Sequence, residues 1–219
     1  MKQYSFNLSK AINKKVFPHY RIKTKAHIIE ILMEVTRFML LQNDSDFIVD
    51  DDNSIGKMIL YIDKMSRLFF FNDKKYYSIV FPFHFLEKEN KYTIIFKSSI
   101  EVNSQLISKV ISIIKCDEFK AQCSLDFATP ICDAEQDCDE NFWEFLRELL
   151  LMEDGYIRYD FDQEEYDKAT ERGEQERHPL NHYDLFYSTN ATFKIGLRDG
   201  LTQENFMDLV NVNTDCKFL

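Results

Sequence analysis

The segment at residues 57–80, KMILYIDKMSRLFFFNDKKYYSIV, decides the fold because it places strand-forming runs one after another along the chain. Its β-branched and aromatic residues gather in runs of five or six, which is typical of β-strands. The polar group Asn72-Asp73-Lys74 separates two of these runs and predicts a turn between antiparallel neighbours. The segment therefore predicts a β-meander.

The meander extends in both directions and is flanked by helices. Strands are expected at residues 47–49, 57–62, 67–71, 76–85 and 92–98. Apolar residues at helical spacing predict helices at residues 24–42, 101–114 and 141–153. Thr24 is a suitable N-cap for the first helix, and Gly155 predicts a left-handed residue after the third.

The C-terminal third predicts further strands and one more helix. We expect a strand at residues 156–161, a charged loop at 162–177, a hairpin of 182–187 with 192–197, and a helix at 203–209. The fold class is α+β: an N-terminal helix plus an antiparallel β-meander, then a helix and a smaller antiparallel sheet. An acidic stretch after Pro130 predicts two α+β regions, 1–130 and 131–219, with one continuous domain as the alternative.

Charge and composition narrow the classes of partner. The net charge of −10 argues against broad nucleic-acid binding, which needs Lys and Arg to neutralise phosphates. Residues 1–37 nevertheless hold eight Lys or Arg against two Glu. This basic segment predicts either contact with a nucleic acid or acidic partner, or docking on the chain's own acidic body.

The expected location is the cytoplasm. No run of about 18 apolar residues occurs, so no membrane span is predicted. The N-terminus has no signal-peptide pattern. Five cysteines, an odd number, then indicate reduced thiols in a cytosolic protein.

Strand alternation gathers polar residues on one face of the C-terminal sheet. In each strand of this region the odd-numbered residues are mostly apolar, so the even-numbered ones share the opposite face. The expected polar face holds Arg158, Asp160, Asp162, His182, Asp184 and Lys194, with His178 at its rim.

Carboxylates and an imidazole in this arrangement predict metal-assisted chemistry. Asp160, Asp162, His182 and Asp184 are the candidate catalytic residues, and Asp160, Asp162 and His182 the candidate ligands of a divalent cation. The candidate ligand-binding residues, which would hold a phosphate or stack on a base, are Arg158, Lys194, His178 and Tyr156. The alternative is an amphipathic sheet whose solvated face carries paired charges.

Three strings of the C-terminal third resemble the signature of an uncharacterised bacterial family. They are GYIRYDFD at residues 155–162, HPLNHYD at 178–184 and TFKIGL at 192–197. The family is a domain of unknown function found near restriction and phage-defence genes. The resemblance covers roughly the last third of the chain and implies a bacterial defence context, without assigning a role to any residue.

Three functions follow from these observations. The first is a non-enzymatic accessory or regulatory subunit of a bacterial defence or restriction-type assembly, which contacts another protein of the same operon. The second is a metal-dependent phosphodiesterase or nuclease. The third is a module that binds a nucleotide or a nucleic-acid end. No phosphate-binding glycine loop or nucleophile motif occurs, which favours the first.

Overall fold

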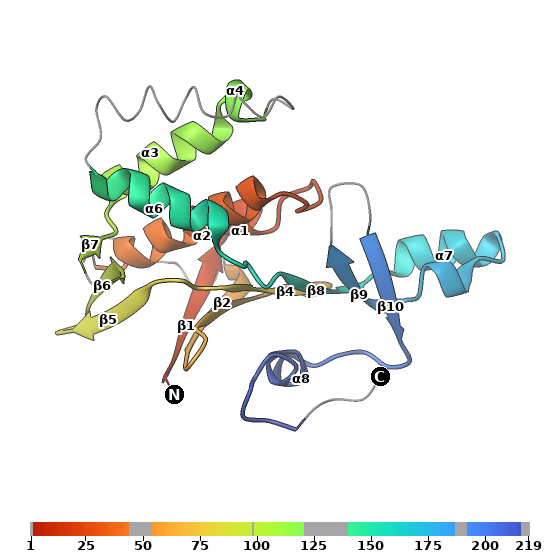
Figure 1. Ribbon diagram of the computed structural model, residues 1–219. Helices are drawn as coiled ribbons and strands as arrows, with labels where there is room; N and C mark the ends of the chain where they lie inside the picture. Colours follow the sequence, from red (N-terminus) through yellow and green to blue (C-terminus); the bar gives the residue numbers. More distant parts are fainter. Residues whose placement is uncertain (1, 44–53, 98, 121–139, 187–191, 216–219) are drawn as a thin grey trace. The chain divides into compact units, whose positions relative to one another are not determined.

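The protein folds as two compact units whose segments alternate along the chain. A computed structural model describes residues 2–43, 54–97, 99–120, 140–186 and 192–215 (Figure 1). The first unit comprises residues 1–10, 51–81 and 154–219, and the second comprises residues 11–50 and 82–153. The predicted boundary near residue 130 lies outside the described residues.

A seven-stranded antiparallel sheet forms the first unit. Its order is β1 (Lys2–Ser9), β2 (Ser54–Ile62), β3 (Arg67–Phe71), β4 (Lys75–Val80), β8 (Ile157–Phe161), β9 (Asn181–Phe186) and β10 (Thr192–Leu197). Every neighbouring pair is antiparallel, so the sheet is a meander whose spatial order follows the chain. The meander is interrupted twice, between β1 and β2 and between β4 and β8, by the segments that build the second unit.

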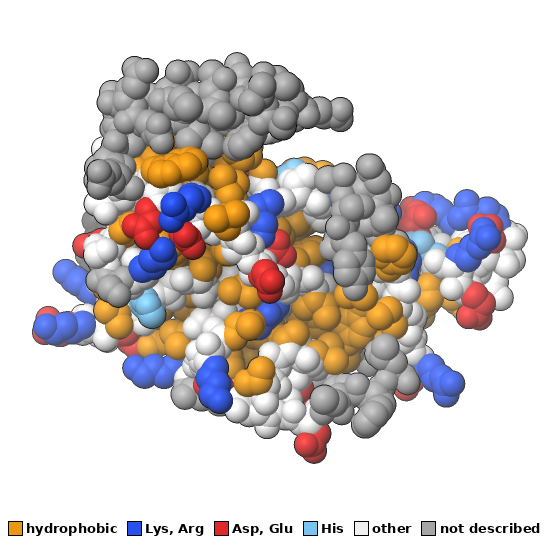
Figure 2. Space-filling view, viewed as in Figure 1, with side chains coloured by type: hydrophobic (Ala, Val, Ile, Leu, Met, Phe, Trp, Pro, Cys, Tyr) orange, Lys and Arg blue, Asp and Glu red, His pale blue; other side chains and the backbone are white. Residues whose placement is uncertain are grey.

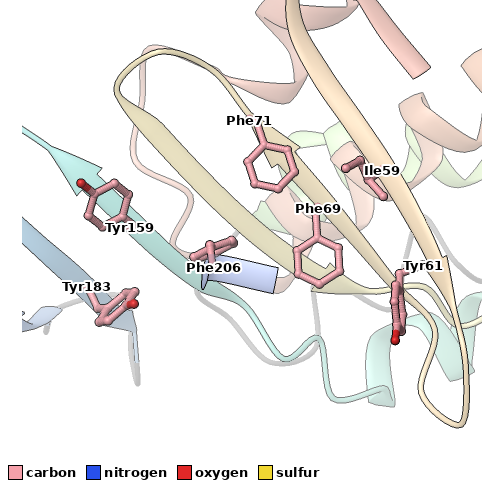
Figure 3. Packing of buried hydrophobic residues seen from close by; sticks show 7 residues of the cluster. All are labelled: Ile59, Tyr61, Phe69, Phe71, Tyr159, Tyr183 and Phe206. Carbon is pink, nitrogen blue, oxygen red and sulfur yellow. The ribbon is translucent and has the colours of Figure 1, made fainter. Parts of the chain in front are cut away.

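One face of this sheet packs on the short helix α8 (Gln203–Asp208). Phe206 is fully buried, and its ring lies 6.3 Å from the rings of both Phe69 and Phe71 on β3. Figure 3 shows Phe206 among aromatic residues contributed by β2, β3, β8 and β9. The Thr202 side chain caps the helix by accepting from the backbone N–H of Asn205.

The second unit combines helices with a three-stranded antiparallel sheet. Its elements are α1 (Lys10–Val16), which starts at the boundary between the units, α2 (Lys25–Leu41), β5 (His84–Lys88), β6 (Lys91–Phe96), β7 (Ile100–Glu101), α3 (Ser104–Lys115), α4 (Asp117–Lys120) and α6 (Glu140–Leu151). Phe145 of α6 packs against Phe83 and Phe96, with ring centroids 5.8 and 5.2 Å away.

The α+β fold class is confirmed, but the C-terminal strands do not form a sheet of their own. β8 pairs with β4, so β8, β9 and β10 extend the meander. The strand expected at residues 76–85 is divided between β4 and β5, which belong to different sheets. Pro82 lies at the break, where its missing N–H and fixed φ end a sheet ladder.

Other predicted elements show a similar mixture of agreement and difference. The helix at 24–42 is confirmed as α2, with Thr24 accepting from the N–H of His27. The prediction of a charged loop at residues 162–177 is wrong, because this segment forms α7 (Gln163–Glu171) and the 3₁₀ helix η3 (Gln175–Arg177). β1 was not predicted at all. The expected strand at 47–49 lies outside the described residues.

The basic segment at residues 1–37 belongs to the folded body of the protein. It forms β1, α1 and most of α2. Within the second unit, Lys15 pairs with Glu34 at 2.7 Å, and the Lys25 ammonium donates to the backbone carbonyl of Met152. Part of the positive charge is therefore compensated internally. Among the described helices, none has the length and apolar character needed to cross a membrane.

Candidate functional site

The register of β8, β9 and β10 brings five ionisable residues together on one face of the sheet. Asp160 lies opposite His182, and Arg158 lies opposite Asp184, across the β8–β9 pair. Lys194 lies opposite Asp184 across the β9–β10 pair. Because side chains directly opposite one another share a face, these five residues converge as the alternation predicts. We call them the ionic cluster.

Ion pairs connect the cationic and anionic members of the ionic cluster. The Arg158 guanidinium donates to Asp160 Oδ2 at 2.7 Å and to Asp184 Oδ2 through the same nitrogen. The Lys194 ammonium lies 3.5 Å from Asp184 Oδ1. Two carboxylates therefore face two cations, and the cluster is close to electrically neutral when its histidine is uncharged.

The hydrogen bonds of His182 determine its tautomer. His182 Nδ1 lies 2.8 Å from the backbone oxygen of Pro179, which can only accept, so this nitrogen carries the proton. His182 Nε2 then accepts from the Lys194 ammonium at 2.7 Å. His178 Nε2 lies 3.2 Å from the same ammonium. Two imidazoles and one carboxylate thus surround Lys194.

The ionic cluster is buried. Arg158, Asp160, His182 and Asp184 are 6, 7, 0 and 3% exposed, and the Lys194 side chain is 22% exposed. Burial, followed by the nearby charge of Lys194, lowers the pKa of His182. Burial also lowers the pKa of Lys194, against the opposing effect of Asp184 and Asp160. The paired charges of the alternative interpretation are therefore present, but the face that carries them is buried and not solvated.

Asp162 lies away from the expected polar face, whereas Tyr156 lies next to Arg158, on the face where strand alternation predicts it. β8 ends at Phe161, and the Asp162 side chain caps α7 by accepting from the N–H of Glu165 at 3.2 Å. Asp162 is thus a helix cap and does not join the cluster. Tyr156 lies beside Arg158 at the edge of the cluster, and burial raises its pKa.

Three members of the ionic cluster can share a metal ion. Asp160, His182 and Asp184 each offer a ligand atom, and these atoms lie within 4.8 Å of one another. The predicted trio was Asp160, Asp162 and His182. Asp184 takes the place of Asp162 because the strand stops one residue before Asp162 and turns into α7.

An apolar groove, which was not predicted, lies on the opposite face of the same sheet. Ile59, Tyr61 and Phe69 form its floor, and Met207 and Val210 form its wall. Its volume is about 320 Å³. Figure 2 shows apolar side chains gathered between the sheet and α8 in the first unit. The alternating apolar residues of β2 and β3 were visible in the sequence, but their cover by α8 was not.

Exposed apolar residues extend this groove toward the solvent. Met65 and Val212 line it and are 53 and 68% exposed. One end is held by a hydrogen bond from the Asn213 amide to Asp63 Oδ2 at 2.7 Å. This bond fixes the chain after α8 to the β2–β3 turn, so that residues after α8 form one wall of the groove.

Comparison with protein-family models, curated proteins and solved structures finds no match to this chain. The resemblance of residues 155–197 to the uncharacterised bacterial family therefore stays a prediction. The class of protein is defined by its own features: an antiparallel sheet with a buried ionic cluster on one face and an apolar groove on the other.

Proposed function

We propose that the chain is a non-enzymatic accessory protein that binds a partner protein through the apolar groove. The observation that carries this proposal is the groove itself, which combines an aromatic floor with exposed apolar residues at its mouth. Apolar residues exposed next to a pocket are typical of interfaces, where an anchor side chain of the partner fills the pocket.

Lys57 and Arg67 line the groove on the sheet side, and acidic residues line it on the α8 side, where they indicate the chemistry of the partner. Glu204 and Asp208 of α8 both line the groove, one helical turn apart. Asp63 at the closed end is already hydrogen bonded to Asn213. An apolar anchor flanked by Lys or Arg on the α8 side therefore complements the groove, because opposite charges at an interface rim favour association.

The metal-dependent phosphodiesterase is less well supported by the geometry. Its candidate residues Asp160 and Asp184 are paired with Arg158, and His182 is completely buried. An attacking water and a phosphodiester would both need access to these groups. The buried ion pairs favour a structural role for the cluster over a catalytic one.

The nucleotide-binding alternative has a related difficulty. Its proposed phosphate ligands, Arg158 and Lys194, are engaged with carboxylates on one face of the sheet. Tyr156, the residue expected to stack on a base, already packs its ring 5.7 Å from that of the buried Tyr77. The groups that would hold a nucleotide are therefore engaged within the protein. The cytoplasmic defence assembly implied by the family resemblance remains the setting in which we expect the partner, encoded in the same operon.

A peptide-display screen tests the proposal. Random 12-residue peptides are selected on the full-length chain, and the affinities of enriched peptides are measured by fluorescence polarisation. We expect enrichment of an apolar anchor flanked by basic residues. Met65→Glu with Val212→Glu should weaken binding at least about tenfold, the scale of one interface hot spot.

Phe193→Glu is the matched control, because Phe193 is 55% exposed in the same unit but lies on β10, outside the groove. This variant should bind the selected peptides as the unchanged protein does. The proposal fails if no peptide is enriched, or if the groove variant and the Phe193→Glu variant bind equally well.

A further inference from the structure

The ammonium of Lys194 lies at the centre of a set of metal-binding atoms. His182 Nε2, His178 Nε2 and Asp184 Oδ1 are 2.7, 3.2 and 3.5 Å from Lys194 Nζ. Two imidazole nitrogens and a carboxylate oxygen form a donor set that zinc and related transition metals prefer. The ammonium therefore occupies the position that a metal ion would take.

The separations between these donors suit a small tetrahedral ion. Ligands at about 2.0–2.1 Å from zinc lie roughly 3.3 Å from one another. His182 Nε2 is 3.7 Å from Asp184 Oδ1 and 4.0 Å from Asp160 Oδ2. Movements of less than about 1 Å would bring His182 Nε2 and these two carboxylate oxygens to metal-ligand spacing.

Outer hydrogen bonds already orient the donors. His182 donates from Nδ1 to the Pro179 carbonyl, which directs Nε2 into the cluster, and metal-binding histidines commonly use this arrangement. Arg158 is bonded to the Oδ2 atoms of both carboxylates, so Asp184 Oδ1 remains directed toward Lys194. A metal-bound Asp184 would keep its outer partner.

Gly196 determines where His178 lies. A Cβ atom at this position of β10 would come within 2.9 Å of the Pro179 ring. The absence of a side chain lets the His178–Pro179 segment lie against β10, which places the His178 imidazole 5.1 Å from that of His182. Asp160 Oδ1 is buried and has no hydrogen-bond partner among the described residues, while Oδ2 of the same carboxylate pairs with Arg158. The Oδ1 atom is therefore available to a metal ion.

We propose that the protein binds Zn²⁺, or a transition metal of similar preference, through Asp160, His182 and Asp184, with His178 as the fourth ligand. Lys194 is the competing resident cation. It lies on the edge strand β10 and its side chain is 22% exposed, so it can turn outward when a metal enters. This site is independent of the apolar groove.

Cobalt and zinc titrations of the metal-free, full-length chain test the proposal. Co²⁺ is followed by its visible absorption, and Zn²⁺ by competition with a chromophoric chelator. We expect one equivalent to bind. His178→Gln and His182→Gln should each weaken binding beyond the roughly 10–100-fold that loss of an outer-shell partner costs. His84→Gln is the control and should not change binding, because His84 is exposed on β5 of the second unit.

Lys194→Met provides an outcome that misfolding cannot imitate. Removal of the competing ammonium should tighten Zn²⁺ binding by about tenfold or more, the scale of a single charge-assisted contact. The proposal is overturned if the unchanged protein binds no stoichiometric metal, even if Lys194→Met does. It is also overturned if binding persists in the His178→Gln, His182→Gln double variant, which would place the metal elsewhere in the chain.

Discussion

Replacement of Arg158 by methionine should strongly destabilise the first unit. The guanidinium is 6% exposed and neutralises two carboxylates, Asp160 and Asp184. Without it, Asp184 keeps Lys194 at 3.5 Å, whereas Asp160 is left beside the His182 imidazole at 4.0 Å, whose lowered pKa favours the uncharged form. Removal of one partner from a buried ion pair typically costs about 3–5 kcal/mol, because the remaining charge has lost its solvent and its counter-ion.

This loss is large enough to measure in two ways. At about 2–4 °C per kcal/mol for a chain of this size, the melting temperature should fall by roughly 6–20 °C. Urea unfolding followed by far-UV circular dichroism gives the corresponding free energy of unfolding. The double variant Arg158→Met with Asp160→Asn should recover part of the loss, since it removes the carboxylate left without compensation.

Arg177→Met is the matched control in the same unit. Arg177 pairs with Glu174 at 2.9 Å, but its side chain is 81% exposed. An exposed pair contributes at most about 1 kcal/mol, so this change should be small. Equal losses in Arg158→Met and Arg177→Met would refute the reasoning, because the buried carboxylates would then not depend on Arg158.

Three further substitutions, with Gly173→Ala as a reference, test packing and helix capping in the first unit. Phe206→Ala should lower the free energy of unfolding by about 3–5 kcal/mol in urea titrations, and a loss below about 1 kcal/mol would exclude α8 from the core. Gly173→Ala should lower the free energy of unfolding by about 1–2 kcal/mol, because Gly173 has a left-handed φ of +69°. Gly155→Ala should lower it further, because a Cβ at Gly155 would also lie 2.9 Å from Arg67 Nη1. An equal cost in calorimetric melting would mean that Arg67 simply moves aside. Asp162→Ala should cost about 1 kcal/mol and reduce helical dichroism, whereas an unchanged spectrum would contradict its capping role.

The sequence predicted the elements whose signals are local. Helical spacing located α2 and α3, and Thr24 caps α2 as expected. Two local signals were nevertheless overlooked. Tyr4, Phe6 and Leu8 alternate with polar residues and indicate β1. The pair Asp162 and Glu165 has the spacing of a capping box and indicates α7.

Strand geometry predicted which residues of the candidate site share a face, but not that this face is buried. Alternation placed Arg158, Asp160, His182, Asp184 and Lys194 on one face because period two fixes side-chain direction within each strand. Burial of that face depends on contacts made after the strands assemble, such as that of Pro179 with Gly196. The apolar groove lies between β2, β3 and α8, and α8 follows these strands by more than a hundred residues in the chain. The spacing of apolar residues within a strand or helix does not predict such a long-range contact.

The interleaving of the two units has a consequence for how the protein folds. Ser9 pairs with Ser54, and Ser78 pairs with Ile157, although each is a neighbouring strand contact. The entropy of closing a loop rises with its length, and such non-local pairings slow folding. During synthesis, β1 must wait for β2, and β4 must wait longer for β8, with apolar edges open in the meantime. Until β8 has been synthesised the edge of β4 lacks its partner, and such an unpaired edge makes a folding intermediate prone to aggregate.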